Sequence, residues 1–229
     1  MNTTFFAIWI AMLIFDGVLM AWLTWAATSE RYGKYRIRPA KTNPIPIMRK
    51  RLNTNLNNFL ALLIFIAYFT YLGEATLYAG WPGVARLLGE TLGVLLLYDL
   101  MYYGYHRCLH HPKLMKYVHG VHHFVRNPTA GESIYLHPAE QMGALGLLIL
   151  AIVVLGPIST TSFLAIFFIY STANIIVHAN LVFPHPAFRL FNFWVATHDV
   201  HHDKVRHNYA SIFPFWDQAF GTFKLVHKQ

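Results

Sequence analysis

Histidine carries most of the chemistry that this sequence offers, and it is concentrated in three short clusters. The chain has 14 histidines and a single cysteine, Cys108, so an internal disulfide and a cysteine-based metal site are both excluded. Within the clusters the histidines are mostly three or four residues apart, a spacing that brings imidazoles to one edge of a helix. The clusters are His106, His110 and His111; His119, His122 and His123; and His198, His201 and His202.

The number and surroundings of these imidazoles favour a centre with two metal ions. Imidazole nitrogen binds Zn, Cu, Fe and Ni, and nine clustered imidazoles exceed the about four to six ligands that one ion takes. Asp99 precedes His106 by two helical turns on the same face. A metal-bound imidazole usually donates its other N–H to a carboxylate or a carbonyl, so we expect Asp99 to orient His106. Outside the clusters, His178 ends an apolar segment, whereas His185, His207 and His227 are expected to be surface or hydrogen-bonded residues.

The segments that must position these residues are strongly apolar. Of the 229 residues, 55% are hydrophobic and only 12% are charged, against about a quarter charged in a soluble domain. This composition excludes a disordered protein and a coiled coil, and it predicts an all-α integral membrane protein. We expect four to five membrane helices or half-helices with a cytosolic histidine-rich helical cap. The apolar segments are Phe5–Trp25, Phe59–Tyr78, Leu87–Tyr105, Met142–Leu155 and Phe163–Val177.

Two parts of the chain are expected to differ in role. Residues 1–58 should form an N-terminal anchor helix and a basic cytosolic loop, and residues 59–229 a membrane catalytic domain. The segments 142–155 and 163–177 flank Gly156-Pro157 and form a helical hairpin, which either crosses the membrane and returns or is partly embedded.

The distribution of positive charge predicts the side on which the chemistry takes place. The net charge is +8, and 17 of the 18 Lys and Arg lie in segments 31–58, 106–141 and 183–229. Successive spans place these three segments on one side of the membrane, and only Arg86 lies opposite. The positive-inside rule makes that side cytoplasmic, in a bacterial inner membrane or an ER-type membrane. All 14 histidines fall on the same side. Basic charge beside apolar segments indicates contact with anionic lipid, not nucleic acid.

The order and spacing of these motifs resemble a known family. The succession HRxxHH, HxxHH and HxxHH is similar to the fatty acid hydroxylase/sterol desaturase superfamily of membrane di-iron enzymes. The resemblance covers residues 95–225, and residues 1–58 carry no motif of the family. Further matching segments are Asp99–Arg107, Glu132–Glu140, Asn208-Tyr209 and Trp216–Thr222.

The resemblance implies that two iron ions activate O2, with zinc in their place after some purifications, to hydroxylate or desaturate a C–H bond of a sterol or fatty acyl lipid. Asn174 stands where some lipid 2-hydroxylases of the superfamily have a histidine, and it is a weak ligand or a hydrogen-bond donor beside the metal. The acidic residues Asp99, Glu132, Asp199 and Asp217 would orient imidazoles or relay protons. The implied metal ligands are His106, His110 or His111, His119, His122, His123, His178, His198, His201 and His202, with His137 as a further ligand or a substrate-site residue.

An external electron donor and a lipid from the bilayer are the expected partners. The sequence contains no haem, flavin or iron–sulfur motif, so a redox carrier such as a ferredoxin or a cytochrome b5-like protein must supply electrons. The basic stretch 31–51 contacts lipid or docks an acidic carrier. Two other functions fit parts of the pattern: a membrane metal carrier or transporter, and a catalytically inactive lipid-binding scaffold. A transporter would hold its ligands at mid-span, whereas these lie at span ends. The sequence predicts no oligomeric state.

Overall fold

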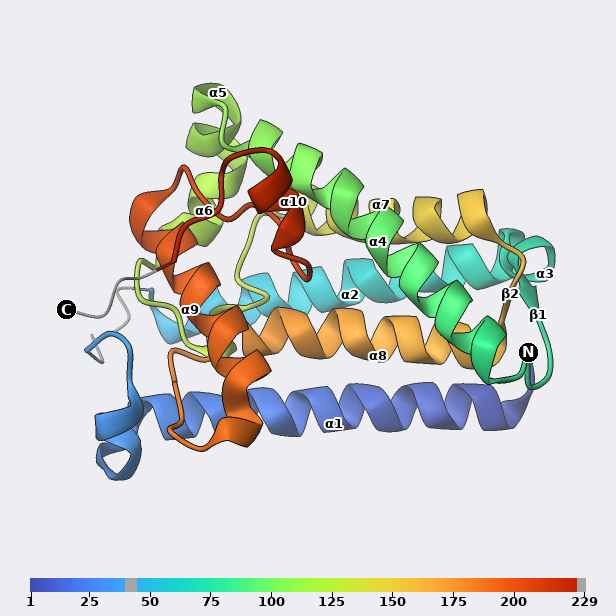
Figure 1. The fold of residues 1–229 in the computed structure, drawn as a ribbon, viewed down its shortest axis with the longest axis horizontal. Helices are drawn as coiled ribbons and strands as arrows, with labels where there is room; N and C mark the ends of the chain where they lie inside the picture. The colour runs from blue at the N-terminus through green and yellow to red at the C-terminus, as the bar shows by residue number, and fades with distance from the viewer. Residues whose placement is uncertain (40–44, 226–229) are drawn as a thin grey trace.

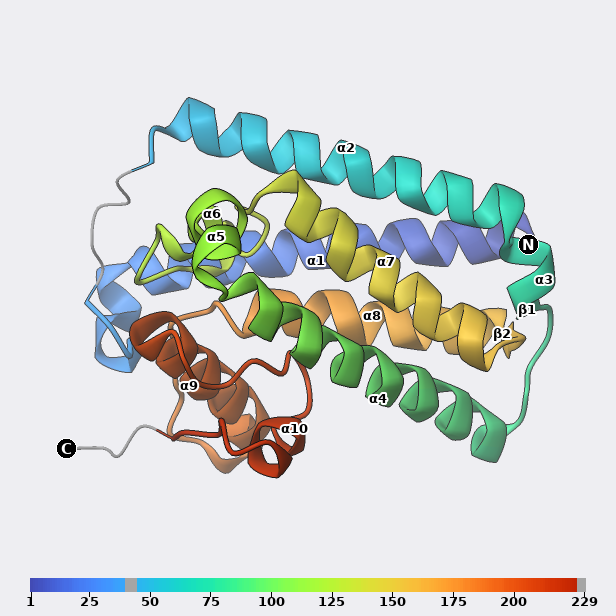
Figure 2. The same cartoon turned by 90° about the horizontal axis from the view of Figure 1, so that it is seen from above.

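A computed structural model describes residues 1–39 and 45–225 of the chain. Five long helices lie side by side and form a bundle, as two perpendicular views show (Figure 1, Figure 2). Helix α4 packs against α7 and α8, α2 packs against α7, and α1 packs against α8. The expected all-α fold is confirmed. The five helices are α1 (Thr3–Thr28), α2 (Ile47–Tyr71), α4 (Val84–Leu109), α7 (Pro138–Leu155) and α8 (Thr160–Ile176).

The apolar composition of these helices suggests an integral membrane protein. Within the described residues, α1, α2 and α7 are long and apolar enough to cross a membrane, and α8 is an apolar helix of 17 residues. Helix α4 is not among these candidates although it has 26 residues. Its sequence includes Arg86, Glu90, Asp99 and Arg107, which lower its hydropathy. The expected third span therefore contains more charged residues than any of the other four long helices, and it lies beside α7 (Figure 2).

The end of the bundle that holds the N-terminus contains a short strand pair that the sequence did not predict. Strand β1 (Leu77–Tyr78) follows α3 (Gly73–Thr76) and pairs in parallel with β2 (Ile158–Ser159). The Glu90 carboxylate links α4 to β2 and α8 at this end, because it accepts hydrogen bonds from the Ser159 N–H and the Ser162 hydroxyl, at 2.8 and 2.7 Å. The α7–α8 hairpin therefore runs to the same end as the α2–α4 connection and returns.

The histidine-bearing segments gather at the opposite end of the bundle (Figure 1). Helix α9 (Arg189–Lys204) lies across this end, together with the short helical turns on either side of the long helices. The segments expected on one side of the membrane thus meet at one end of the molecule. The division expected at residue 58 falls inside α2 and stays a prediction. The short elements are η1 (Glu30–Tyr35), α5 (Pro112–Leu114), η2 (Met115–His119), α6 (Gly120–His123), η3 (Ala130–Glu132), η4 (Pro186–Phe188) and α10 (Phe215–Ala219).

Two apolar cores hold the histidine-rich end onto the bundle. The larger core joins α4, α7 and α8 through buried residues such as Tyr98, Leu148 and Phe163. The smaller core joins the end of α1 to α9 through Leu23 and Val195. Helix α9 is therefore packed against the membrane helices, which fixes the position of its three histidines.

Candidate metal centre

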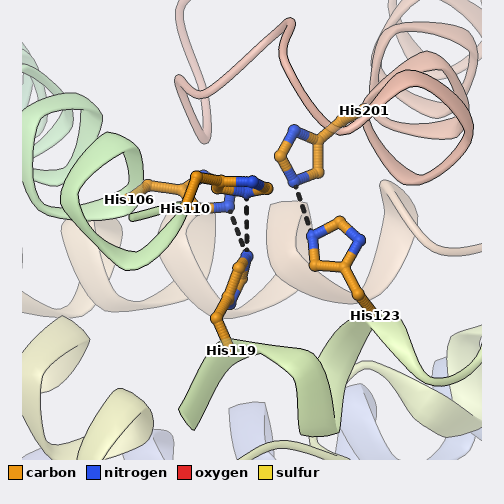
Figure 3. Close-up of side chains that lie close together, drawn as sticks. All are labelled: His106, His110, His119, His123 and His201. Carbon is orange, nitrogen blue, oxygen red and sulfur yellow. Dashed lines mark hydrogen bonds between the residues drawn. The ribbon is translucent and has the colours of Figure 1, made fainter. Parts of the chain in front are cut away.

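Nine histidines form two compact groups of imidazoles at this end of the bundle. Within each group the potential ligand nitrogens all lie within 4.8 Å of one another. Figure 3 shows the first group, whose rings come from α4, the 115–123 segment and α9 and point toward a common centre. We name the groups cluster A, consisting of His106, His110, His119, His123 and His201, and cluster B, consisting of His122, His178, His198 and His202.

Neighbouring histidines in the sequence belong to different clusters. His123 lies in cluster A and His122 in cluster B, and His201 and His202 divide in the same way. Adjacent residues of a helix point about 100° apart, so one helical turn supplies both clusters. The expectation that each sequence cluster presents three imidazoles on one edge is therefore wrong. The two clusters adjoin each other, since the ring centroids of His123 and His202 are 4.7 Å apart.

In five of the nine cluster imidazoles the outer nitrogen, Nδ1, lies within hydrogen-bonding distance of an oxygen. Nδ1 of His106 lies 2.8 Å from the Tyr209 carbonyl, and Nδ1 of His201 lies 2.8 Å from the His207 carbonyl. A carbonyl can only accept, so Nδ1 carries the proton and donates it. In a neutral ring, Nε2 is then a lone pair that faces the cluster.

These lone pairs lie too close together to be stable without a cation. Nε2 of His106 is 3.0 Å from Nε2 of His119, whose Nδ1 donates to the Glu140 carboxylate. In cluster B, Nε2 of His178 is 3.2 Å from Nε2 of His122. Two nitrogens bound to one ion at about 2.1 Å, at right angles, are about 3 Å apart. The donor set therefore fits a metal ion in each cluster.

Burial keeps these imidazoles in the neutral form that metals bind. It lowers the pKa of His110, His119 and His122 to about 3 and that of His178 to about 4. The pKa of His202 also lies well below the usual value, through burial and the charge of its imidazole neighbours. A proton is thus disfavoured as the cation that separates the paired lone pairs.

Asp99 does not orient His106, contrary to the sequence expectation. Its carboxylate accepts hydrogen bonds from the backbone N–H groups of Ser211, Ile212 and Phe213, at 2.7 to 2.9 Å. The segment before α10 folds over α4 and brings the Tyr209 carbonyl to His106 instead. Asp99 therefore fixes the segment that supplies the partner of His106.

The other three acidic residues also hold the chain in place and have no described hydrogen bond to a cluster imidazole. Glu132 pairs with Lys50 and closes a capping box at Thr129. Asp199 forms an ion pair with Arg38 at 2.9 Å. Asp217 accepts a hydrogen bond from the Tyr209 N–H at 2.7 Å. The expected roles in orienting imidazoles are corrected to structural ones.

Three further residues of the expected set lie outside the clusters. His111 is exposed, so the choice between His110 and His111 falls on His110. His137 caps α7, where its Nδ1 accepts from the Ala139 N–H at 3.1 Å. The Asn174 carbonyl accepts from His178 Nδ1 at 2.8 Å. Of the isolated histidines, His185 caps η4 and His207 supplies a carbonyl to His201, while His227 lies outside the described residues.

Glu140 is the functional residue that sequence reasoning missed. It is buried, and Oε1 lies 2.8 Å from His119 Nδ1. Within residues 1–39 and 45–225, no other carboxylate is described in a hydrogen bond to a cluster imidazole. Its sequence signal is the acidic residue one turn after the His137-Pro138 start of α7.

A small pocket touches both clusters. His106 contributes from cluster A, and His178 contributes from cluster B. The polar residues Asn174 and Ser211 also line it, as does Glu140. Leu136 and Val177 add apolar side chains to its walls, so the lining offers both apolar and polar contacts beside the two clusters.

The chain is similar to one protein-family profile and to several known proteins. The fatty acid hydroxylase profile matches residues 91–222. Methylsterol monooxygenase 1 of Gallus gallus is 30% identical over 198 residues, which are 82% of this chain and 66% of that protein. Cholesterol 25-hydroxylase-like protein 1, member 2 of Danio rerio is 29% identical over 202 residues, 82% of this chain and 71% of that protein.

A third relative is similar over a shorter region. Fatty acid hydroxylase ahd1 of Mycosarcoma maydis is 33% identical over 112 residues, which are 47% of this chain and only 29% of that protein. No solved structure matches the chain significantly. Of these three relatives, the two whose names refer to a sterol match over 82% of this chain.

Proposed function

The chain belongs to the fatty acid hydroxylase family, and from this membership we propose that it is a membrane-bound di-iron enzyme that uses O2 to hydroxylate or desaturate a C–H bond of a lipid. The observation that carries the proposal is the pairing of imidazole lone pairs at 3.0 to 3.2 Å in two adjoining clusters. The clusters lie at one end of the bundle and not midway along it (Figure 1). A metal transporter would need ligands along its pathway, so this position favours an enzyme.

Cluster A would hold one iron ion and cluster B the other, and iron would supply the activation of O2 that no side chain can perform. The protein holds each imidazole with Nε2 directed inward. The Tyr209 and His207 carbonyls orient His106 and His201, and Glu140 orients His119.

The pocket between the clusters would place the substrate. Its contact with both clusters brings a C–H bond beside the metal pair, and Asn174 and Ser211 offer hydrogen bonds to the polar group of a lipid. A sterol or a fatty acyl lipid entering from the bilayer meets these requirements. The names of the two relatives that match 82% of this chain favour a sterol as the first substrate to test.

We place the site on the cytoplasmic side, together with the external electron donor. The support is the charge distribution, since 17 of the 18 Lys and Arg belong to segments that meet at the histidine-rich end.

The direct test is oxygen-dependent modification of lipids in membranes that contain the protein. Lipids extracted after incubation under 18O2 should gain one heavy oxygen atom, or lose two hydrogens on desaturation. His110→Ala should abolish product, because His110 belongs to cluster A, whereas His111→Ala should keep it, because His111 is exposed. Equal product from the wild type and His110→Ala would contradict the proposal.

A further inference from the structure

A chain of aromatic rings leads from cluster A to the protein surface. The buried Tyr209 ring contacts three imidazoles of cluster A, with centroids 5.1 Å from His110, 5.7 Å from His106 and 5.8 Å from His201. The Tyr103 ring lies 5.9 Å from Tyr209 and stacks on Phe220 at 4.8 Å. Phe220 is 50% exposed. Each ring is therefore in contact with the next, from the imidazoles to solvent.

This route is specific to cluster A. Among the described ring contacts, the imidazoles of cluster B touch only other imidazoles. Cluster A has a second aromatic neighbour, Tyr102, at 5.3 Å from His106. That ring leads inward to Tyr98, which is buried in the core, and it also lies 6.3 Å from the half-buried Tyr105 ring. Of these described routes, Tyr209–Tyr103–Phe220 ends on the more exposed ring, since Phe220 is 50% exposed.

Two arginines lie near the exposed end of the route. Arg107 and Arg206 are exposed, and the Arg107 guanidinium donates to the Tyr103 hydroxyl at 3.3 Å. Arg206 directly precedes His207 and Asn208, both of which contact the Thr222 carbonyl, and the Thr222 hydroxyl lies 3.0 Å from the Tyr103 hydroxyl.

Two carboxylates lie in the same chain segments as these residues, and both are engaged within the protein. Asp217 is buried and accepts hydrogen bonds from the backbone N–H groups of Tyr209 and Ala210. Asp203 is exposed but is engaged by Arg38 and Lys204. A surface with one sign of charge attracts partners of the opposite sign and raises their association rate.

We propose that an acidic one-electron carrier protein docks over Phe220, between Arg107 and Arg206, and that its electrons reach cluster A through Tyr103 and Tyr209. This inference rests on the proposed function, because only a redox-active metal centre needs such a donor. Each transfer oxidises the carrier by one electron and reduces the metal site by one electron. Two transfers, with two protons, supply what a monooxygenation needs to convert the second oxygen atom of O2 to water.

The docking step is tested by binding, without any turnover. The zinc-loaded protein in lipid nanodiscs is titrated with a reduced plant-type ferredoxin, which is acidic and carries one electron. Arg107→Glu/Arg206→Glu should weaken binding by about tenfold or more, because reversed charges repel an acidic partner. The matched control is Arg31→Glu/Lys34→Glu, which makes the same change of charge in η1, on the other side of the histidine-rich end (Figure 1), and should bind normally.

The control also decides between two basic surfaces. Loss of binding in Arg31→Glu/Lys34→Glu alone would overturn the proposal and place the carrier on the 31–51 stretch. Another outcome is that, in nanodiscs of uncharged lipid, both double variants bind the ferredoxin as the wild type does. If, in addition, Arg107→Glu/Arg206→Glu lowers the thermal stability of the protein in nanodiscs of anionic lipid, the surface contacts lipid and the proposal is wrong. Arg206→Glu alone keeps the Arg107–Tyr103 hydrogen bond, so it tests docking if the double variant fails to fold.

The transfer step is tested by anaerobic reduction of the iron-loaded protein. Phe220→Leu should bind the ferredoxin normally but be reduced by it several-fold more slowly, since a saturated side chain replaces the outermost ring. Dithionite, which is small, should reduce the wild type and the variant at the same rate. If dithionite-reduced wild type forms no lipid product under O2, the proposed function fails. If it forms product and the variant accepts electrons from ferredoxin at the wild-type rate, only the electron route fails.

Discussion

At the scale of single residues, the centre depends on which atom each imidazole is hydrogen-bonded to. His106, His178 and His201 donate Nδ1–H to backbone carbonyls, whereas His119 donates to the Glu140 carboxylate. A carboxylate raises the basicity of the imidazole that it accepts from more than a neutral carbonyl does. His119 should therefore be the strongest donor of cluster A.

We predict that Glu140→Leu weakens metal binding in cluster A by about 10–100-fold, the usual range when a partner of a metal-bound histidine is lost. The measurement is metal retention during titration with a chelator. Glu132→Gln is the matched control, because Glu132 is also buried but pairs with Lys50. Metal retention that is equal in the wild type and Glu140→Leu would show that Glu140 has only a packing role.

As the pH falls, the metal-free protein should lose stability at a higher pH than a typical helical bundle does. Burial lowers the pKa of His119 and His122 to about 3 in the folded state, and an unfolded imidazole titrates near about 6.5. Between these values the unfolded state binds more protons, so stability is complete above about pH 6.5 and is lost as the pH falls toward 3. The melting temperature of the metal-free protein in detergent should drop between pH 7.5 and 5.5. A melting temperature that is unchanged or rises over this interval contradicts the burial of neutral imidazoles.

The sequence predicted the histidine ligands better than it predicted their partners. Spacing identified eight of the nine clustered imidazoles, because three- and four-residue intervals determine a helical face; it did not identify the isolated His178, and it included His111, which is exposed. Asp99 shares a face with His106, but seven residues of helix extend about 10 Å, too far for a hydrogen bond. The real partner, the Tyr209 carbonyl, lies 103 residues away in the sequence and no local pattern could identify it.

At the scale of elements, the position of α9 relative to the bundle determines whether cluster B closes. The segment before α2 pairs with the chain after His178, where the Arg38 N–H donates to the Asn180 side chain at 2.9 Å. The Arg38 guanidinium also donates to both oxygens of Asp199 on α9, at 2.9 and 3.1 Å. Arg38 thus joins the two chain segments that carry His178 and His198.

Replacing Arg38 should loosen cluster B more than cluster A. We expect Arg38→Gln to lower the free energy of unfolding by about 1 kcal/mol, which is less than the about 1.5–3 kcal/mol typical of hydrogen bonds to charged groups because Arg38 is partly exposed. The measurement is thermal unfolding together with metal content, which should fall toward one ion per chain. Lys34→Gln, at an exposed residue of η1, should leave both values unchanged. If Arg38→Gln keeps the wild-type metal content and stability, Arg38 does not help to close cluster B.

At the scale of the whole molecule, hydropathy and the parity of the spans predicted which segments would meet. The loops that carry the histidines lie at one end, and the turn at 80–83 lies at the end that holds the N-terminus (Figure 1). The division of His122 and His123 between two clusters was not predictable, because it depends on the tertiary position of α9 and His178. The β1–β2 pair was also missed, since two-residue strands leave no periodicity in a sequence.

Topology reporters should separate the two ends of the molecule. A reporter fused at the C-terminus should lie in the cytoplasm, and one inserted in the Gly80–Gly83 turn should lie on the opposite side. A glycine-rich turn without buried side chains tolerates such an insertion. Detection of both reporters in one compartment would contradict the placement of the histidine-rich end.

The number of metal ions per chain tests the central claim most directly. Protein reconstituted anaerobically with Fe(II) and freed of excess metal should contain two ions per chain by elemental analysis, one for each cluster. His123→Ala should weaken binding in cluster A and His122→Ala in cluster B, although the two residues are adjacent in the sequence. A wild-type protein that binds one ion or none under these conditions would contradict a dinuclear histidine centre.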